Sequence, residues 1–318
     1  MIEQQAPSQP STSAARRWVT WTVVLASFAA IVVYLSRTQE ELASARRLSI
    51  QLLGVTTVIQ LVSQICLNGS LLLPLLKRVT RLGFWELYLV RTGGFFVGSL
   101  VPVAGGLAVR LAYLRGRGLT YLDFTWATLF SNVLALAAAA VLASAATAVL
   151  WLTAGRPPAA VLWVLGGVLF ISLIVAAGFE YLPRFTRHPK LGKWRRLSEM
   201  SSLTASRPLA LKVFGLSVAR HALNFVTFGL LYQSLSGEPA SFLAGGLVYA
   251  LTTPVRIVNI TPANLGVTEW FTALVGRMVA FDVATGLIVS LAFRGVALVA
   301  QSAGAAFGSA WLGVRRNG

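Results

Sequence analysis

The sequence predicts an all-α polytopic membrane protein, and three observations lead to this fold class. Of the 318 residues, 56% are hydrophobic and 12% are charged, and the mean hydropathy is +0.72. Soluble domains carry about 25% charged residues. The apolar residues also come in continuous blocks of roughly 18 to 30 residues, the length that an α-helix needs to cross a bilayer. A membrane β-barrel is disfavoured, because its strands would show alternating rather than continuous apolar residues.

The chain is strongly basic, with a net charge of +17. Basic chains often bind nucleic acid, but here the positive residues cluster between apolar blocks, as the positive-inside rule describes. We therefore expect them to face an anionic membrane surface and expect no nucleic-acid partner. The densest cluster, from Arg184 to Arg196, is the predicted contact with anionic lipid head groups. The single cysteine, Cys66, excludes a disulfide framework within the chain.

The domain organisation follows from composition. Residues 1–15 are polar and predict a disordered cytoplasmic tail, and residues 16–318 predict a single transmembrane domain. Within this domain we expect a first half (16–182), a basic cytoplasmic loop (183–206) and a second half (207–318). The first apolar block has no small-residue cleavage pattern after it, so it is expected to remain as an uncleaved helix. The distribution of basic residues places both termini in the cytoplasm and the protein in the cell (inner, cytoplasmic) membrane.

Six full crossings are predicted from these basic anchors. They are residues 18–35, 49–76, 121–152, 159–181, 209–235 and 286–312. Two further apolar segments, 83–114 and 242–280, have both ends on one side of the membrane. That side is cytoplasmic for the first segment and external for the second.

Each of these two segments is interrupted in its middle by helix breakers. SLVPVAGGLAVR contains Pro102, Gly105 and Gly106, and NITPANLGVTEW contains Pro262 and Gly266, so both hold a Pro-x-x-x-Gly pattern. We expect two broken re-entrant hairpins that form an inverted repeat, the layout with which transporters build a midplane site. The alternative is eight spanning helices with ordinary kinks, because membrane helices tolerate Pro and Gly.

Charged residues inside the apolar blocks are the candidates for function. Each charge costs roughly 2.5 to 3.5 kcal/mol at the bilayer centre, and most of those present are arginines, whose guanidinium group suits phosphate. Glu86 and Arg91 are expected near the interface, with their charged ends directed to water. The predicted substrate-binding residues are Arg110, Arg256, Glu269 and Arg294.

The motifs SLVPVAGGLAVRLAYL and ITPANLGVTEW, together with LAFRG in the last helix, resemble the flippase-like membrane family. That family includes the membrane domain of lysylphosphatidylglycerol synthases and related stand-alone proteins. The resemblance extends from about residue 18 to residue 312. It implies translocation of a lipid between leaflets, and it assigns functional roles to Arg110, Glu269 and Arg294.

Two positions depart from the family pattern. Leu107 follows the glycine pair where many relatives have an acidic residue, and Asn264-Leu265 replaces a glycine-rich step. The resemblance therefore does not fix which lipid is bound. The chain ends at Arg315-Arg316 with no soluble domain after it, so we expect no aminoacyl-transfer activity.

Three functions compete at this point. The leading one is translocation of a lipid with an anionic or phosphate-bearing head group, and the second is a scaffold or regulator for a lipid- or polysaccharide-modifying partner. The third, a membrane enzyme, has little support, since His188 and His221 have no metal-binding spacing around them and no nucleotide-binding P-loop is present. We expect no enzymatic activity, no cofactor and no metal site.

Overall fold

The computed structural model describes residues 14–38, 43, 45–76, 82–100, 105–155, 157–186, 206–257 and 264–317. Within these residues the chain is all-helical, which confirms the predicted class. A short 3-10 helix, η1, covers Ala45–Arg47. The α-helices are α1 (Ala14–Arg37), α3 (Ile50–Leu76), α4 (Phe84–Leu100), α5 (Gly105–Gly116), α6 (Tyr121–Ala154), α7 (Ala159–Thr186), α9 (Arg207–Ser236), α10 (Ser241–Ile257), α11 (Val267–Met278) and α12 (Val283–Asn317).

Within the described residues, four helices are long and apolar enough to cross a membrane. They are α3, α6, α9 and α12, with apolar spans Ile50–Leu76, Tyr121–Thr153, Arg207–Ser236 and Val283–Leu312. These helices lie where the sequence predicts the crossings 49–76, 121–152, 209–235 and 286–312. The predicted crossings 18–35 and 159–181 coincide with α1 and α7, and in α7 the described apolar stretch is the shorter Ala159–Ile174.

Two helix ends fall inside segments that the sequence predicts as tail or loop. Helix α1 begins at Ala14, inside the predicted tail 1–15, because Ala14 and Ala15 are strong helix formers. Helix α7 continues to Thr186, so the first residues of the predicted loop 183–206 are helical. The rest of that loop, including most of the basic cluster Arg184–Arg196, lies outside the described residues.

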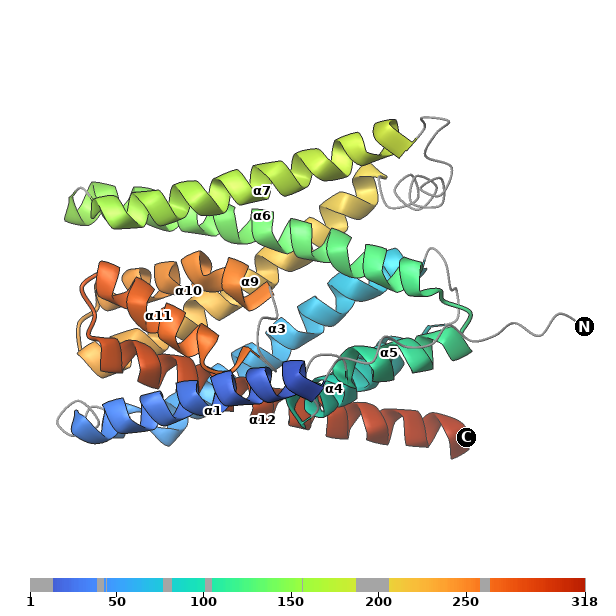
Figure 1. Ribbon diagram of the computed structural model, residues 1–318, viewed down its shortest axis with the longest axis horizontal. Coiled ribbons are helices and arrows are strands. Elements are labelled where there is room, and N and C mark those ends of the chain that lie inside the picture. Colours follow the sequence, from blue (N-terminus) through green and yellow to red (C-terminus); the bar gives the residue numbers. More distant parts are fainter. Residues whose placement is uncertain are drawn as a thin grey trace, which may run out of the picture.

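Each of the two interrupted segments forms a pair of helices, and the corresponding helices of the two pairs have the same length. Helices α4 and α5 have 17 and 12 residues, and α10 and α11 also have 17 and 12. In Figure 1 the α4–α5 pair occupies the right part of the molecule and the α10–α11 pair the left part. The inner ends of both pairs point toward the middle of the molecule. The predicted helix breakers Pro102 and Pro262 lie outside the described residues.

Helices α3 and α9 pack against each other through the centre of the molecule. Around them the contacts of the two halves correspond: α6 packs against α9 and α10, whereas α12 packs against α3 and α4. The largest buried cluster encloses α10, where Leu247, Val248 and Leu251 are at most 1% exposed. This packing holds the inner end of α10, and with it the second pair of helices, against the long helices.

Large apolar side chains cover the outer surface of α7. Trp163, Phe170 and Leu173 are 81%, 63% and 68% exposed. Exposed apolar side chains of this size are expected on a helix that faces lipid, since the hydrocarbon accepts them without cost. Buried polar side chains, among them Gln60, Asn224 and Glu269, lie instead on the inward faces of α3, α9 and α11.

Candidate functional site

The carboxylate of Glu269 lies in the first turn of α11 and is 1% exposed. Its Oε2 accepts a hydrogen bond from the backbone N–H of Gly266 at 2.7 Å. Gly266 has a φ of 81°, a left-handed conformation that glycine adopts without strain. The turn thus aims a free N–H at the carboxylate, and the positive end of the helix dipole adds to this stabilisation.

Arg294 of α12 neutralises this carboxylate. Its Nε donates to Glu269 Oε1 at 2.8 Å, and its Nη2 lies 2.6 Å from the same oxygen. The same Nη2 donates to the carbonyl of Asn264 at 3.5 Å. Helices α11 and α12 approach closely enough for this pair because Gly286 lies against the backbone of Ala273, where an added Cβ would come within 2.6 Å of Cα.

Arg256, at the inner end of α10, lies beside the ion pair in an aromatic surround. Its guanidinium group lies 4.9, 5.3 and 5.7 Å from the ring centroids of Phe228, Phe293 and Tyr249, within the range of cation–π attraction. Its Nη2 donates to the hydroxyl of Thr272 at 3.1 Å. Its hydrogen-bond partners in the described part of the chain are hydroxyl groups, so its charge is held by rings and dipoles rather than by a bonded carboxylate.

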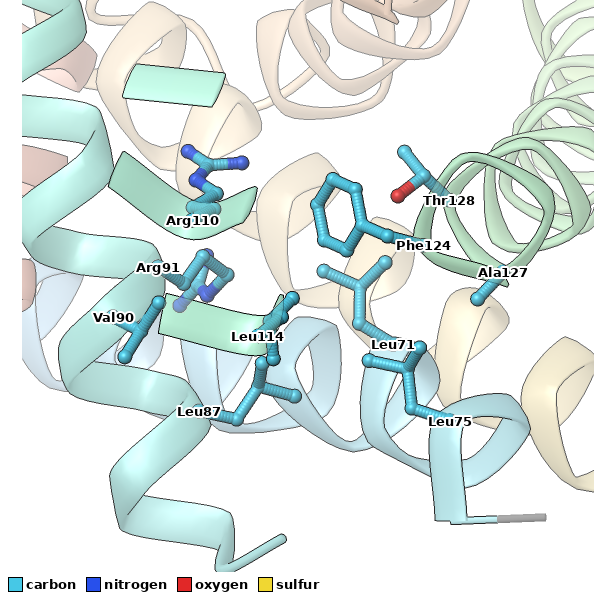
Figure 2. A pocket seen from close by; sticks show the side chains of 10 residues that line it. All are labelled: Leu71, Leu75, Leu87, Val90, Arg91, Arg110, Leu114, Phe124, Ala127 and Thr128. Atoms are coloured by element: carbon cyan, nitrogen blue, oxygen red, sulfur yellow. The ribbon is translucent and has the colours of Figure 1, made fainter. Parts of the chain in front are cut away.

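A second group of arginines lies in the other helix pair, α4–α5, beside a small pocket. The space in and in front of this pocket, including open solvent, is about 390 Å³. Figure 2 shows Arg91 of α4 and Arg110 of α5 on one side of this pocket. The opposite walls come from α3 and α6 and include Leu71, Leu75 and Phe124. No carboxylate occurs among the described residues that line the pocket. The pocket therefore combines positive charge with an apolar wall.

Arg91 is buried, with 8% exposure. Its Nη1 donates to Gln64 Oε1 at 2.9 Å, and its guanidinium group lies 5.1 Å from the centroid of the Tyr88 ring. Its Nε and that of Arg110 are both buried without a hydrogen-bond partner among the described residues. The expectation that Arg91 directs its charged end to water is therefore wrong, because its guanidinium group is buried against Gln64 and Tyr88.

Gly94 holds the two arms of this pair together. A Cβ at Gly94 would lie 2.6 Å from Arg110 Nε and 2.7 Å from the carbonyl oxygen of Gly106. Glycine at this position lets the Arg110 side chain cross the face of α4. Gly94 thus positions Arg110, which agrees with the usual role of small residues in close helix packing.

A line of buried polar side chains runs between the two groups of arginines. Gln60 on α3 donates to Asn224 Oδ1 on α9 at 2.6 Å, and Ser63 donates to the same oxygen at 3.0 Å. Asn224 Nδ2 donates to the hydroxyl of Tyr249 at 2.8 Å. Gln64, which binds Arg91, follows Ser63 on α3, and the Tyr249 ring faces Arg256. The line therefore reaches from one group of arginines to the other along α3 and through Asn224.

The comparisons with known proteins can now be set against this geometry. A family model described as the lysylphosphatidylglycerol synthase TM region matches residues 19–305. The chain belongs to this family. It is accordingly a multi-pass membrane protein of the lysylphosphatidylglycerol synthase TM family, and the resemblance seen in the sequence is confirmed. Comparison with curated proteins and with solved structures gives no match.

The four predicted substrate-binding residues of this family member fall into two places. Arg256, Glu269 and Arg294 come together as expected, whereas Arg110 lies with Arg91 in the pocket of the first half. The lining residues of this pocket belong to α3, α4, α5 and α6. Sequence reasoning missed Gln64, although a glutamine inside an apolar helix is itself a signal of an internal partner.

Proposed function

We propose that this protein translocates a lipid with an anionic or phosphate-bearing head group between the leaflets of the cell (inner) membrane. The observation that carries the proposal is the excess of positive charge at interior helix positions. Five arginines occupy such positions: Arg91, Arg110, Arg220, Arg256 and Arg294. Among the carboxylates whose side chains are described, Glu269 is the buried one, with 1% exposure, whereas Glu86 and Asp123 are partly exposed and Glu238 and Asp282 are exposed.

Uncompensated cations inside a membrane protein need a counter-charge. Moving an arginine to the bilayer centre costs roughly 2.5 to 3.5 kcal/mol on insertion scales, and a bound phosphate recovers much of that cost through charge-assisted hydrogen bonds. A lipid supplies such a phosphate while its acyl chains remain in the hydrocarbon. Contacts of the head group with the arginines would thus replace the hydration that it loses on leaving water.

The arrangement of helices supports an inverted repeat. The order α1, α3, α4–α5, α6 corresponds to α7, α9, α10–α11, α12, and both helix pairs have arms of 17 and 12 residues. The contacts of α6 with α9 and α10 correspond to those of α12 with α3 and α4. In our proposal the two pairs are re-entrant hairpins that enter from opposite faces, as transporters with alternating access require.

Glu269 acts in this proposal as an internal anion. In the absence of lipid, Glu269 forms an ion pair with Arg294. It is protonated or displaced when a phosphate group reaches the second hairpin, α10–α11. The carboxylate thereby keeps the lipid from binding irreversibly. The phosphate must displace Glu269 from Arg294 in order to bind, and the lipid is released when Glu269 pairs with Arg294 again. No covalent step is involved, so we propose transport rather than catalysis.

The experiment is a leaflet-sidedness assay in proteoliposomes that contain a fluorescent anionic phospholipid. Wild type should accelerate the exchange of lipid between leaflets, and Glu269→Gln should slow it about tenfold or more, equivalent to about 1.4 kcal/mol of barrier. Glu238→Gln, which removes an exposed acid between α9 and α10, is the matched control. Equal rates for wild type and Glu269→Gln would count against this mechanism, and no acceleration by wild type would count against transport itself.

A further inference from the structure

The two helix pairs differ in the charge that follows the shared Pro-x-x-x-Gly pattern. Three and four residues after Gly266 stand Glu269 and Trp270, whereas Val109 and Arg110 occupy the same positions after Gly106. The second pair thus carries its own anion and has it bound to Arg294. The first pair places a cation beside Arg91 and no carboxylate among the described lining residues of the pocket.

Two acids adjoin lining residues in the sequence, and both are engaged elsewhere. Asp123, beside Phe124, accepts hydrogen bonds from the backbone N–H and the hydroxyl of Thr120. The other acid is Glu86, beside Leu87. It accepts hydrogen bonds from Tyr113 and Arg117 and from the backbone N–H of Gly83 at 3.1 Å. Arg91 follows Glu86 by five residues, which on an α-helix corresponds to about 140° around the axis. Glu86 therefore does not compensate the charges of the pocket.

The positive charge in this region extends beyond the two lining arginines. Arg110 and Arg220 both act unfavourably on Arg91, so three cations from α4, α5 and α9 lie within electrostatic reach of one another. The Arg91 side chain is more than nine-tenths buried, and its Nε and that of Arg110 have no hydrogen-bond partner in the described part of the chain. Such a cluster favours a ligand with net negative charge.

The depth of the pocket indicates which leaflet supplies the ligand. Leu75, Leu87, Leu114 and Phe124 lie within about one turn of the ends of α3, α4, α5 and α6. Those ends lie together at the right of Figure 1. Exposed basic residues lie at the end of α5 (Arg115 and Arg117) and near the start of α9 (Lys212). These two helix ends also lie at the right of Figure 1, and the positive-inside rule identifies such a basic end as cytoplasmic.

We propose that the pocket between α3, α4, α5 and α6 is the loading site for the phosphate of an anionic phospholipid without an ammonium group, entered from the cytoplasmic leaflet. This inference rests on the proposed transport function and names its substrate class. The Arg91 and Arg110 guanidinium groups hold the phosphate, while Leu71 and Phe124 contact the first part of an acyl chain. In this proposal the phosphate lies at the open side of the pocket, beside the two guanidinium groups, and the acyl chains extend outside it.

The exclusion of ammonium groups follows from the same geometry. A zwitterionic head group would place a positive charge beside arginines, with no carboxylate among the described lining residues to accept its hydrogen bonds. Leaving a charged donor without a partner costs about 1 to 3 kcal/mol. This corresponds to a preference of about five- to 150-fold for the lipid that lacks the ammonium group.

The test measures bound lipid and does not depend on transport. The full chain in detergent is incubated with equal amounts of phosphatidylglycerol and phosphatidylethanolamine that have the same acyl chains, then repurified, and the retained lipids are quantified. Wild type should retain phosphatidylglycerol about tenfold over phosphatidylethanolamine. Arg110→Gln should abolish this preference, and Arg277→Gln, which removes an exposed arginine at the end of α11, should preserve it.

A second substitution guards against a folding defect in the first. Thr128 lies across the pocket from Arg110 in Figure 2 and has a buried hydroxyl with no partner among the described residues. Thr128→Glu would supply a tethered carboxylate that competes with the lipid, so retention should fall while thermal stability is kept. Thr128→Gln, of the same size but neutral, should retain the lipid.

The outcomes separate the two proposals. Equal retention of both lipids by wild type, or a preference unchanged by both Arg110→Gln and Thr128→Glu, would overturn the loading site even if vesicle assays show transport. A retained preference without lipid movement would overturn transport and leave the site standing. Complete displacement of the lipid by inorganic phosphate would reassign the pocket to a free anion.

Discussion

Gln60 on α3 donates a hydrogen bond to Asn224 on α9 at 2.6 Å, and this bond joins the two halves of the molecule. Ser63 donates to the same oxygen, while the Asn224 amide donates to Tyr249. Asn224 thus serves three partners from one buried position. In hydrocarbon none of these groups has water as an alternative partner, so the fold depends on the amide more than a soluble protein would.

We predict that Asn224→Ala lowers the free energy of unfolding by about 2 kcal/mol, since interhelical hydrogen bonds in membranes average about 0.6 kcal/mol each and three are lost. Reversible unfolding by sodium dodecyl sulfate, followed by circular dichroism, measures the change. Thr227→Val is the control, because the contact of Thr227 with Gln60 across the two helices is longer, at 3.4 Å. The other hydrogen bond of Thr227 goes to the Leu223 carbonyl of its own helix. Equal effects of the two substitutions would contradict a special role for Asn224.

Glu269→Ala should destabilise the fold by about 3 kcal/mol or more, because it leaves the Arg294 charge without its carboxylate partner. The double variant Glu269→Ala/Arg294→Ala should recover part of that loss. A double-mutant cycle on thermal or denaturant unfolding should give a coupling energy of about 0.5 to 3 kcal/mol. Strict additivity of the two single effects would mean that the 2.6 Å pair contributes nothing to stability.

Gly94→Ala should separate α4 from α5, because the new Cβ would meet the Gly106 carbonyl and the Arg110 side chain below 3 Å. Overpacking of this kind costs about 1 to 3 kcal/mol. Its neighbour offers a matched control: nothing lies within 4 Å of a Cβ at Gly93, so Gly93→Ala should change stability by less than about 0.5 kcal/mol. Thermal midpoints in one detergent would compare the two, and a similar loss for both would rule out close packing as the cause.

Arg256→Lys keeps the charge but removes the flat group that lies against Phe228, Tyr249 and Phe293. Arginine and lysine are not equivalent at stacked sites, and we expect a loss of about 1 kcal/mol of stability together with slower lipid movement in vesicles. Arg277→Lys, at an exposed position, should leave both unchanged. Full activity of Arg256→Lys would show that charge alone is needed.

The proposed topology can be tested with single cysteines on a Cys66→Ser background. Cysteines at Arg117 and Lys212 should react with an impermeant maleimide from the cytoplasmic face, and cysteines at Glu238 and Asp282 from the external face. All four positions are exposed in the structure. The parent Cys66→Ser variant should not react from either face. Labelling of Arg117→Cys and Glu238→Cys from the same face would contradict opposed hairpins.

Much of the fold could be predicted because membrane crossing depends on the length of apolar blocks, which one sequence shows directly. The start of α6 at Tyr121 agrees with the prediction to the residue, since Thr120 and Asp123 form a capping box there. The Glu269–Arg294 pair was also foreseeable, because an acid in hydrocarbon needs a cation close by. In both cases the chemistry of a few residues determines the structural feature, the start of a helix or the presence of an ion pair.

The position of Arg91 could not be predicted in this way. Its depth depends on the direction in which α4 runs, and its partner Gln64 comes from another helix 27 residues earlier. The separation of Arg110 from the Glu269 group likewise depends on which long helices face each helix pair. Both are properties of tertiary packing, on which the apolar pattern of a single helix carries no information.

The equal arms of the two helix pairs, 17 and 12 residues in each, have a consequence for vectoriality. In the proposed transport, a scaffold whose halves match in dimensions offers inbound and outbound lipid comparable routes. Any net bias must then originate in the few side chains that break the match, above all Arg110 in one half and Glu269 in the other. Exchange of Val109-Arg110 for Glu-Trp, with the reciprocal exchange at Glu269-Trp270, would accordingly reverse the bias without redesign of the backbone.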